Sequence, residues 1–385
     1  MRSTKAIIHL ENLKSNIRQI KSLTKKDTLF LCPVKANAYG HVTVECARAA
    51  LEAGADYLSV ATTEEGILLR ENGIKAPVLL FSLCSIDEVE DCVRYRITPF
   101  AFDEEYIMMF EDACARAHVK NFPIHLAIDT GMGRIGCYPE EAGELAKVIS
   151  SSKHLFLEGI CTHLAVSDSA EPENIKYTQE QKNRFLQAVE NVRKAGINPK
   201  ICHIANSAAT LALPDFHFDM IRPGIIIYGY YADQINKEYL EKKGIKIDLK
   251  PVMTLETEIC SIRHFTKGMS VGYGRSWTCD QDTDIAVLPI GYGDGFLRRN
   301  SKAGIQVAIN GKNYPVRGRI CMDQCMVDIG LNSGIKRWDR AVIFGTKEDG
   351  ALQDANDVAN MTDTISYEVT TSVSERVPRI YTDVD

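Results

Sequence analysis

Lys35 ends an apolar segment, LFLCPVKA, that covers residues 29–36. A lysine at the end of an apolar strand is poorly solvated, which lowers its pKa and leaves a neutral amine able to form a Schiff base with an aldehyde. On residue type alone, a salt-bridged or snorkelling lysine at the rim of a sheet is the commoner case. Other residues must therefore decide between the two interpretations.

Two later segments carry residues that suit a phosphate group. Asn206 and Ser207 begin an expected helix in HIANSAAT, and Gly224 lies in RPGIIIYG. A helix start supplies unpaired backbone N–H groups, Ser207 a hydroxyl, and Gly224 a close approach of the backbone. Alone, Ser207 also fits a plain N-cap and Gly224 a plain turn. Together with a poorly solvated lysine, these residues predict pyridoxal phosphate as the cofactor.

Eight strand-like segments, separated by helix-like segments, position these residues. They cover residues 29–36, 57–61, 77–82, 97–102, 122–129, 155–164, 200–207 and 218–224. Continuous apolar strands indicate a parallel sheet covered on both faces, and eight βα units predict a closed (β/α)8 TIM barrel, with an open doubly wound sheet as the alternative. In a barrel, the strand ends bring one set of polar residues to one mouth: Lys35, Asp129 with Arg134, His163, Asn206 with Ser207, and Arg222.

An α/β protein with two domains is predicted. After the charged stretch 236–250, strands with turns replace the alternation of helices and strands. We therefore predict a barrel domain over residues 1–240, which binds the cofactor, and a mostly-β domain over residues 241–385. Asn310-Gly311 between alternating runs predicts a type I′ hairpin, and one helix is expected over residues 354–364.

Composition excludes several classes of protein. The 385 residues carry a net charge of −6 without a basic run, which argues against a nucleic-acid partner. No apolar stretch is long enough to cross a membrane and the start of the chain does not resemble a signal peptide, so we expect no membrane partner and a cytoplasmic location. The twelve cysteines are scattered without a C-x-x-C motif, which predicts reduced, mostly buried thiols and no metal site.

The sequence resembles the alanine racemases, fold-type III pyridoxal phosphate enzymes with an N-terminal barrel and a C-terminal β domain. The resemblance runs nearly end to end, through PVKANAYGH, DTGMGRIG, EGICTH, HIANSAA, IRPGIIIYG, VGYGRSWT, LPIGYGDGFLRR, GRICMDQCMVD, ISYEV and RVPRIY.

The resemblance implies a role for residues in each motif. Lys35 would carry the covalent link to the cofactor. The residues that hold the phosphate would be Tyr39, Ser207, Gly224, Ile225 and Tyr367, with Asn206 beside them. Arg222 would contact the pyridine nitrogen, and His163 would support both Arg222 and a second catalytic base, Tyr273.

The resemblance also implies a substrate pocket. The substrate carboxylate would be bound by Arg134 and the backbone N–H of Met322, and the entrance narrowed by Tyr292 and Tyr367. The approach would be lined by Asp168, His203, Arg298 and Arg319. Because Tyr273 and Met322 lie in the β domain while Lys35 lies in the barrel, we expect a homodimer in which each β domain completes the partner's site.

Two bases are needed for racemisation. Inversion through a planar carbanion requires a proton acceptor on one face and a donor on the other, and Lys35 and Tyr273 would supply them. A tyrosine of ordinary pKa ~10 is a poor base near neutral pH, so positive charge from His163 beside Arg222 is expected to favour its phenolate. From the residues alone, Tyr273 also fits a hairpin tyrosine that packs its ring.

Arg222 bears on the type of reaction. Arginine is not deprotonated in proteins, so Arg222 would leave the pyridine nitrogen unprotonated and weaken the cofactor as an electron sink. A short-lived carbanion favours prompt reprotonation, which suits a racemase. A pyridoxal phosphate-dependent decarboxylase is the alternative, but it should have an acidic residue at this position. A non-catalytic cofactor carrier would not need the β domain.

One position departs from the family pattern. Two residues before the aspartate of DTGMGRIG the family usually has a carbamylated lysine, which orients the substrate-binding arginine, and here Ala127 stands there. We expect either a bound anion such as chloride or a neighbouring carboxylate to replace it beside Arg134. Val42, where a glycine is common, is expected to change only the start of a helix.

The expected activity is the interconversion of L- and D-alanine, which supplies D-alanine for peptidoglycan. Serine or a broader set of small amino acids is the alternative, because an apolar pocket rejects a hydroxymethyl group only weakly. Spore germination and catabolism stay open as physiological roles.

Overall fold

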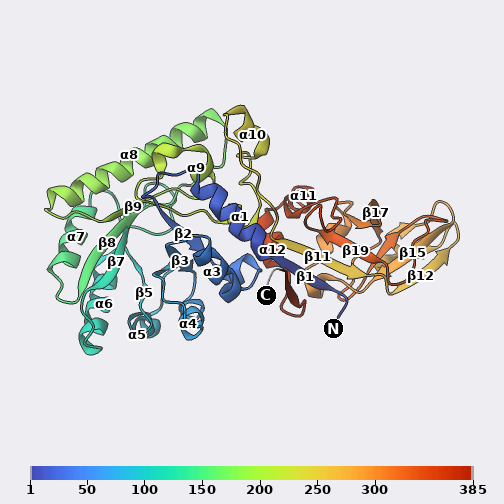
Figure 1. Cartoon of the computed structure of the whole chain (residues 1–385), viewed down its shortest axis with the longest axis horizontal. Coiled ribbons are helices and arrows are strands. Elements are labelled where there is room, and N and C mark those ends of the chain that lie inside the picture. The colour runs from blue at the N-terminus through green and yellow to red at the C-terminus, as the bar shows by residue number, and fades with distance from the viewer. Residues whose placement is uncertain (1, 383–385) are drawn as a thin grey trace.

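Nine parallel strand segments build a barrel in the N-terminal part of the chain (Figure 1). In this computed structural model, which describes residues 2–382, the segments are β2 (Leu29–Pro33), β3 (Tyr57–Val60), β4 (Val78–Leu80), β5 (Ile97–Thr98), β6 (Phe100–Ala101), β7 (Phe122–Ala127), β8 (Leu155–Cys161), β9 (Ile201–His203) and β10 (Met220–Ile221). Only Pro99 separates β5 from β6, so the segments form eight barrel strands. β10 pairs with β2, and backbone hydrogen bonds from Asp219 and Arg222 join it to the β9 side. The predicted barrel and its eight strands are confirmed.

The barrel is filled and covered by apolar side chains. One residue from each of the eight strands fills its interior: Leu31, Tyr57, Leu79, Phe100, Ala127, Cys161, Ile201 and Met220. The helices around it are α1 (Leu10–Lys21), α3 (Thr43–Glu52), α4 (Thr63–Glu71), α5 (Val89–Arg94), α6 (Glu104–Arg116), α7 (Ala142–Ser151), α8 (Pro172–Lys194), α9 (Ser207–Ala212) and α10 (Lys237–Lys242). In α8, for example, Pro172 stands at the helix start and Phe185, Val189 and Val192 form the buried stripe.

A nine-stranded sheet forms the core of the β domain, in the order β12-β15-β18-β17-β16-β19-β11-β1-β20. Its strands are β1 (Lys5–His9), β11 (Met253–Glu258), β12 (Ser261–Phe265), β15 (Thr283–Leu288), β16 (Gln306–Ile309), β17 (Lys312–Arg317), β18 (Cys325–Asp328), β19 (Arg340–Phe344) and β20 (Arg379–Thr382). A separate hairpin pairs β13 (Ser270–Val271) with β14 (Trp277–Thr278). Asn310 and Gly311 join β16 to β17 with φ values of 48° and 76°, as a type I′ turn requires.

Two elements differ from the prediction. β1 pairs with β11 and β20, so residues 5–9 lie in the sheet of the β domain and not in the barrel domain predicted from residue 1 (Figure 1). The helix predicted over residues 354–364 is confirmed as α11 (Ala355–Met361), but it is not the single helix of the domain, because a second helix, α12 (Ser366–Thr371), follows it. Asp363, with φ of 53°, turns the chain between them.

The cysteines agree with the predicted reduced, mostly buried thiols. All twelve cysteines are free thiols and ten of them are buried. Within residues 2–382, no helix has the length and apolar character needed to span a bilayer. The cytoplasmic location stays a prediction.

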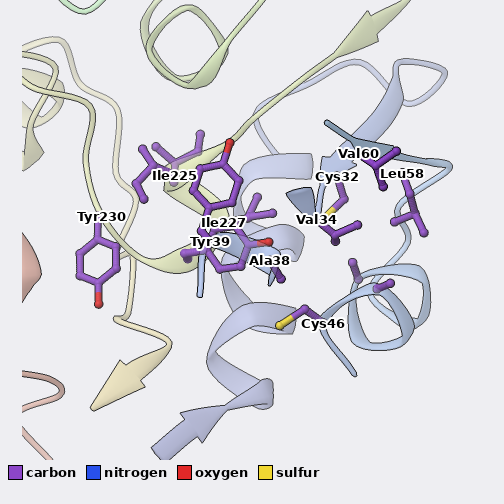
Figure 2. Packing of buried hydrophobic residues seen from close by; sticks show 14 of the residues in the cluster. Cys32, Val34, Ala38, Tyr39, Cys46, Leu58, Val60, Ile225, Ile227 and Tyr230 are labelled. Atoms are coloured by element: carbon purple, nitrogen blue, oxygen red, sulfur yellow. The ribbon is translucent and has the colours of Figure 1, made fainter. Parts of the chain in front are cut away.

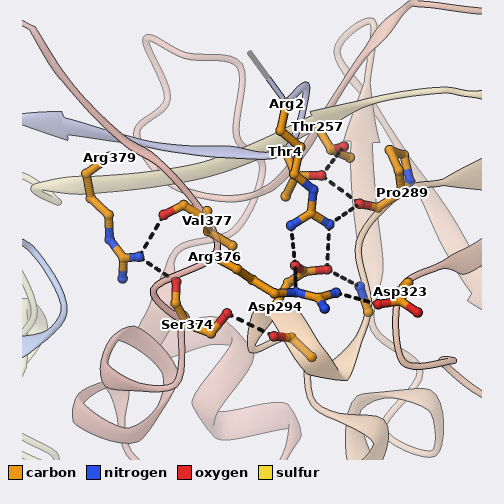
Figure 3. A network of polar contacts seen from close by, with 12 residues as sticks. Arg2, Thr4, Thr257, Pro289, Asp294, Asp323, Ser374, Arg376, Val377 and Arg379 are labelled. Atoms are coloured by element: carbon orange, nitrogen blue, oxygen red, sulfur yellow. Dashed lines mark hydrogen bonds and ion pairs between the residues drawn. The ribbon is translucent and has the colours of Figure 1, made fainter.

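A buried carboxylate, Asp294, ties the first residues of the chain to its C-terminal segment (Figure 3). Its side chain has no solvent exposure and accepts hydrogen bonds from Arg2, from Arg376 Nε at 2.7 Å and from Gly291 N at 2.9 Å. Burial alone would raise the pKa of Asp294, but the hydrogen bonds from Arg2 and Arg376 hold that pKa below its ordinary value.

Asp294→Asn is therefore expected to lower the free energy of unfolding at pH 7 by about 2 kcal/mol. The stabilisation from a carboxylate with a lowered pKa is complete above its unfolded pKa and is lost as the pH falls through the folded pKa. The difference between variant and wild type should thus shrink below about pH 4. Urea unfolding of the variant and the wild type, at pH 7 and again below pH 4, measures this difference in stability. Asp323→Asn, which removes the exposed carboxylate partner of Arg376, is the control. Equal stabilities at pH 7 would contradict the assignment.

Candidate active site

A cavity of about 620 Å³ opens at the carboxyl ends of the barrel strands. It brings together most of the site residues predicted from the sequence: Lys35, Tyr39, Arg134, His163, Asn206, Ser207, Arg222, Gly224 and Tyr367. Asp168, Phe81 and Ala127 also line it. Lys35 and Tyr367, which are 332 positions apart in the chain, thus share one pocket.

Lys35 is positioned by an unusual turn. β2 ends at Pro33, and residues 36–39 all have φ between 51° and 55°, a left-handed turn called α2 (Lys35–Tyr39). This conformation costs L-residues about 1–2 kcal/mol each, so the surroundings must hold it. Glu65 does so in part, because its Oε1 accepts a hydrogen bond from Ala36 N at 2.6 Å. Gly40 ends the turn where a Cβ would lie 2.3 Å from Thr370 O of α12.

The amine of Lys35 is poorly solvated, as predicted. Burial, followed by the positive charge of Arg134, lowers the pKa of Lys35, while Glu65 opposes the shift. Lys35 is the one lysine that lines the cavity among the residues that the structure describes. It therefore has the properties of an amine nucleophile or a proton acceptor.

Hydroxyl and backbone donors gather beside Lys35. Gly224 N donates a hydrogen bond to Ser207 Oγ at 2.8 Å, and the rings of Tyr39 and Tyr367 lie 5.6 Å apart. Asn206 caps α9 through a bond from Ala209 N and accepts a further bond from Ser167 Oγ. The side chains of Ile225 and Tyr39 belong to the apolar core seen from close by in Figure 2, so Ile225 can offer only its backbone.

These donors fit pyridoxal phosphate. A Cβ at Gly224 would lie 3.0 Å from Tyr39 Oη and 3.4 Å from Ser207 Oγ, so glycine keeps the space between these hydroxyls open. Two guanidinium groups, those of Arg134 and Arg222, line the cavity against one carboxylate, that of Asp168. Such an excess of positive charge suits a ligand with a phosphate and a substrate carboxylate.

Gly224→Ala is expected to weaken the binding of pyridoxal phosphate by about tenfold, the worth of one hydrogen bond, because the new methyl group crowds Tyr39 Oη. Titration of the apoprotein, followed by the visible absorbance, measures the dissociation constant. Gly196→Ala, just after α8 and outside the cavity lining, serves as the control, because alanine at its φ of 84° strains the backbone without crowding any atom. An unchanged affinity would show that the phosphate does not lie at Gly224.

Arg222 is buried and held by four acceptors. It donates to Thr162 O at 2.8 Å, His203 O at 2.7 Å, His203 Nδ1 at 2.9 Å and His163 Nδ1 at 3.4 Å. No carboxylate of the described chain contacts it. Burial and then the charge of Arg222 lower the pKa of His163 to about 3, so this imidazole is neutral. The positive charge that we expected from His163 therefore resides on Arg222 alone.

Five of the predicted residues that belong to the β domain do not line this cavity. Tyr273 lies between β13 and β14 with 66% of its surface exposed, and Met322 and Tyr292 are 53% and 40% exposed. Ile225, His203, Arg298 and Arg319 also do not line it.

The position of Ala127 is only partly explained. Ala127 and Arg134 both line the cavity, and Arg134 forms no hydrogen bond or ion pair with any residue that the structure describes. Within residues 2–382, no carboxylate forms an ion pair with Arg134 in place of the carbamate. The bound anion stays a prediction.

Sequence reasoning missed Glu65. Its carboxylate accepts hydrogen bonds from Ala36 N, Ala61 N and Thr62 N, and so joins the Lys35 turn to the start of α4. Thr62 and Glu65 form a capping box, a T-x-x-E pattern that the sequence does display. What no local pattern could show is that the same carboxylate reaches Ala36.

The fold and the cavity define a two-domain barrel enzyme whose active site lies at the carboxyl ends of the strands. Models of "Alanine racemase, N-terminal domain" and "Alanine racemase, C-terminal domain" match residues 8–232 and 252–381. An alanine racemase from Treponema denticola is 46% identical over all of this chain and 99% of its own length, and alanine racemase 1 from Clostridium acetobutylicum is 40% identical over 98% and 94%.

Solved structures agree with these relatives. The alanine racemase of Clostridium difficile superposes with a TM-score of 0.91 at 35% identity, over 99% of this chain and 96% of the other. That of Bacillus anthracis with bound L-Ala-P gives 0.89 at 32% identity, over 99% and 95%. The chain belongs to the alanine racemase family, and it is accordingly an enzyme of the isomerase class.

Proposed function

We propose that the chain interconverts L- and D-alanine with pyridoxal phosphate, in active sites shared by the two subunits of a homodimer. The observation that carries the proposal is the placement of a poorly solvated lysine in one cavity with the open space between Tyr39, Ser207 and Gly224. The chemistry of these donors favours an aldehyde cofactor with a phosphate group.

The cofactor site follows from these contacts. When bound, pyridoxal phosphate withdraws electrons from the amino acid and makes its Cα–H acidic. The amine of Lys35 would hold its aldehyde carbon, and Arg222 would face its ring nitrogen. Its phosphate would be held by Tyr39, Asn206, Ser207, Gly224, Ile225 and Tyr367. Because Arg222 has only donors and keeps its proton, the ring nitrogen would stay unprotonated, which argues against a decarboxylase.

Lys35 and Tyr273 of the partner subunit would move the proton at Cα. On one face, the neutral amine of Lys35 takes or returns it. On the other face, the phenol oxygen of Tyr273 of the partner subunit would take or return the proton, and the positive charge of Arg222 would favour the ionised form of this phenol. The exposure of Tyr273 outside its own cavity supports a place in the partner's site.

The substrate would be oriented by its carboxylate. Arg134 faces the cavity without a partner among the described side chains, so its guanidinium is free to bind a carboxylate in bidentate fashion, joined by the backbone N–H of Met322. Tyr292 and Tyr367 would narrow the entrance and restrict the substrate to small side chains. D-Alanine made in this way would supply peptidoglycan in the cytoplasm.

The proposal is tested by incubating the holoenzyme with either enantiomer of alanine and following optical rotation. We expect both reactions to end at equal amounts of the two enantiomers, since they have equal free energies in water. A panel of small amino acids, including serine, tests the substrate. A faster turnover of serine would overturn alanine as the substrate, and no racemisation of any amino acid would overturn the activity.

A further inference from the structure

A chain of hydrogen bonds runs from Arg222 into the interior of the barrel. Arg222 Nη1 lies 2.9 Å from His203 Nδ1, His203 Nε2 lies 2.8 Å from His125 Nδ1, and His125 Nε2 lies 3.1 Å from Glu158 Oε2. Both histidines have no solvent exposure, and the carboxylate side chain is 19% exposed. These four side chains, from β7 to β10 and the residues just after it, form what we call the barrel relay.

The backbone is built to admit this relay. Ile124 of β7 pairs with Leu157 of β8 and His125 pairs with Gly159, so Glu158 is the extra residue of a β-bulge. Bulges redirect a side chain out of the regular alternation. A Cβ at Gly159 would lie 2.5 Å from the His125 ring, so only glycine leaves room for the imidazole. The local irregularity and the small residue thus serve the same contact.

The chemistry of the two ends fixes every proton between them. A guanidinium can only donate and a carboxylate can only accept, so His203 Nδ1 must accept and His125 Nε2 must donate. One arrangement satisfies both: each imidazole is neutral and carries its proton on Nε2. Burial lowers the pKa values of His125 and His203, which agrees with neutral rings. All three hydrogen bonds then point from Arg222 toward Glu158.

We propose that Glu158 is a positioning residue that acts as the remote counter-ion of Arg222, through His125 and His203. A buried guanidinium without a carboxylate partner is costly, and aligned hydrogen bonds in a low dielectric pass on part of a distant charge. Glu158 would thereby hold Arg222 at its place in the cavity. This inference rests on the proposed racemase function, in which Arg222 faces the cofactor ring.

The proton arrangement can be tested without any activity. Neutron diffraction from crystals of the perdeuterated holoenzyme should show deuterium on Nε2 of His125 and His203 and none on Nδ1 of either. A deuterium on Nδ1 of either ring would overturn the proposal. Because neutron diffraction does not measure turnover, it tests the proton arrangement separately from the racemase function.

The effect on catalysis is tested with two different variants. Glu158→Gln keeps an acceptor for His125 but removes the charge, and Gly159→Ala keeps every charge but displaces the ring. Both should lower kcat for alanine about tenfold or more, by analogy with the loss of the carboxylate partner of a metal-bound histidine, with KM changed less than about twofold. KM should hold because neither residue lines the cavity.

A matched control separates positioning from stability. Glu111 accepts a hydrogen bond from His154 Nδ1 at 2.8 Å, and its side chain is 13% exposed, but the pair lies outside the barrel relay. Glu111→Gln should leave kcat unchanged. If Gly159→Ala does not fold, the kcat of Glu158→Gln alone tests the proposal. An unchanged kcat in Glu158→Gln, or an equal loss in Glu111→Gln, would overturn the proposal.

Discussion

Replacing Lys35 by alanine is expected to abolish both the visible absorbance of bound pyridoxal phosphate and the racemisation of alanine. Lys35 provides the one lysine amine in the described cavity, so no neighbour can take over its bond to the aldehyde. The loss of a covalent and proton-transferring group should lower kcat by about 10³-fold or more. Absorbance spectra and polarimetry of the purified variant measure the two effects.

Two further variants separate the amine from its charge. Lys35→Arg keeps a positive charge but no neutral amine, so we expect the same loss as with alanine. Lys21→Ala removes a half-buried lysine that bonds to Gly54 O outside the cavity, and it should leave the spectrum unchanged. A visible band that survives in Lys35→Ala would refute the covalent role.

Tyr273→Phe is expected to keep the cofactor and its spectrum while losing most of the racemisation, about 10²- to 10⁴-fold. The substitution removes one hydroxyl and leaves the ring, and Tyr273 does not line the cavity of its own chain. Because one base remains, exchange of the Cα proton with deuterium from solvent should persist for one enantiomer only. Mass spectrometry of alanine incubated in D₂O measures this asymmetry.

A second exposed tyrosine provides the control. Tyr138 is 67% exposed, close to the 66% of Tyr273, but it lies in the barrel domain. Tyr138→Phe should keep full activity. Unchanged racemisation of both enantiomers by Tyr273→Phe would remove this residue as a base.

The barrel could be predicted because its signal is local. Each strand is an apolar run of a few residues, and a barrel then places the ends of all its strands at one mouth, which is why Lys35, His163, Ser207 and Arg222 were found together. The place of β1 in the β domain was not predicted, because the sequence of a short apolar strand is the same in either domain. Only its pairing with β11, far along the chain, assigns it to the β domain.

The parts of the site that sequence could not provide depend on distant pairs. The sequence predicted a positive charge on His163, but burial and the neighbouring charge of Arg222 lower the pKa of this imidazole. The spacing of residues in the sequence does not show either effect. The bulge at Glu158 adds a residue to one strand, so its effect on His125 depends on the register with β7. Such contacts join residues whose separation along the chain carries no information about their distance.

The most direct test of the account asks whether Lys35 and Tyr273 act in one site from two different chains. Lys35→Ala and Tyr273→Phe chains, each inactive alone, are mixed, denatured and refolded together with pyridoxal phosphate. Random pairing gives mixed dimers in half of the cases, each with one intact site, so about a quarter of the wild-type activity should return. A mixture as inactive as its two parents, in spite of proven mixed dimers, would contradict the shared site.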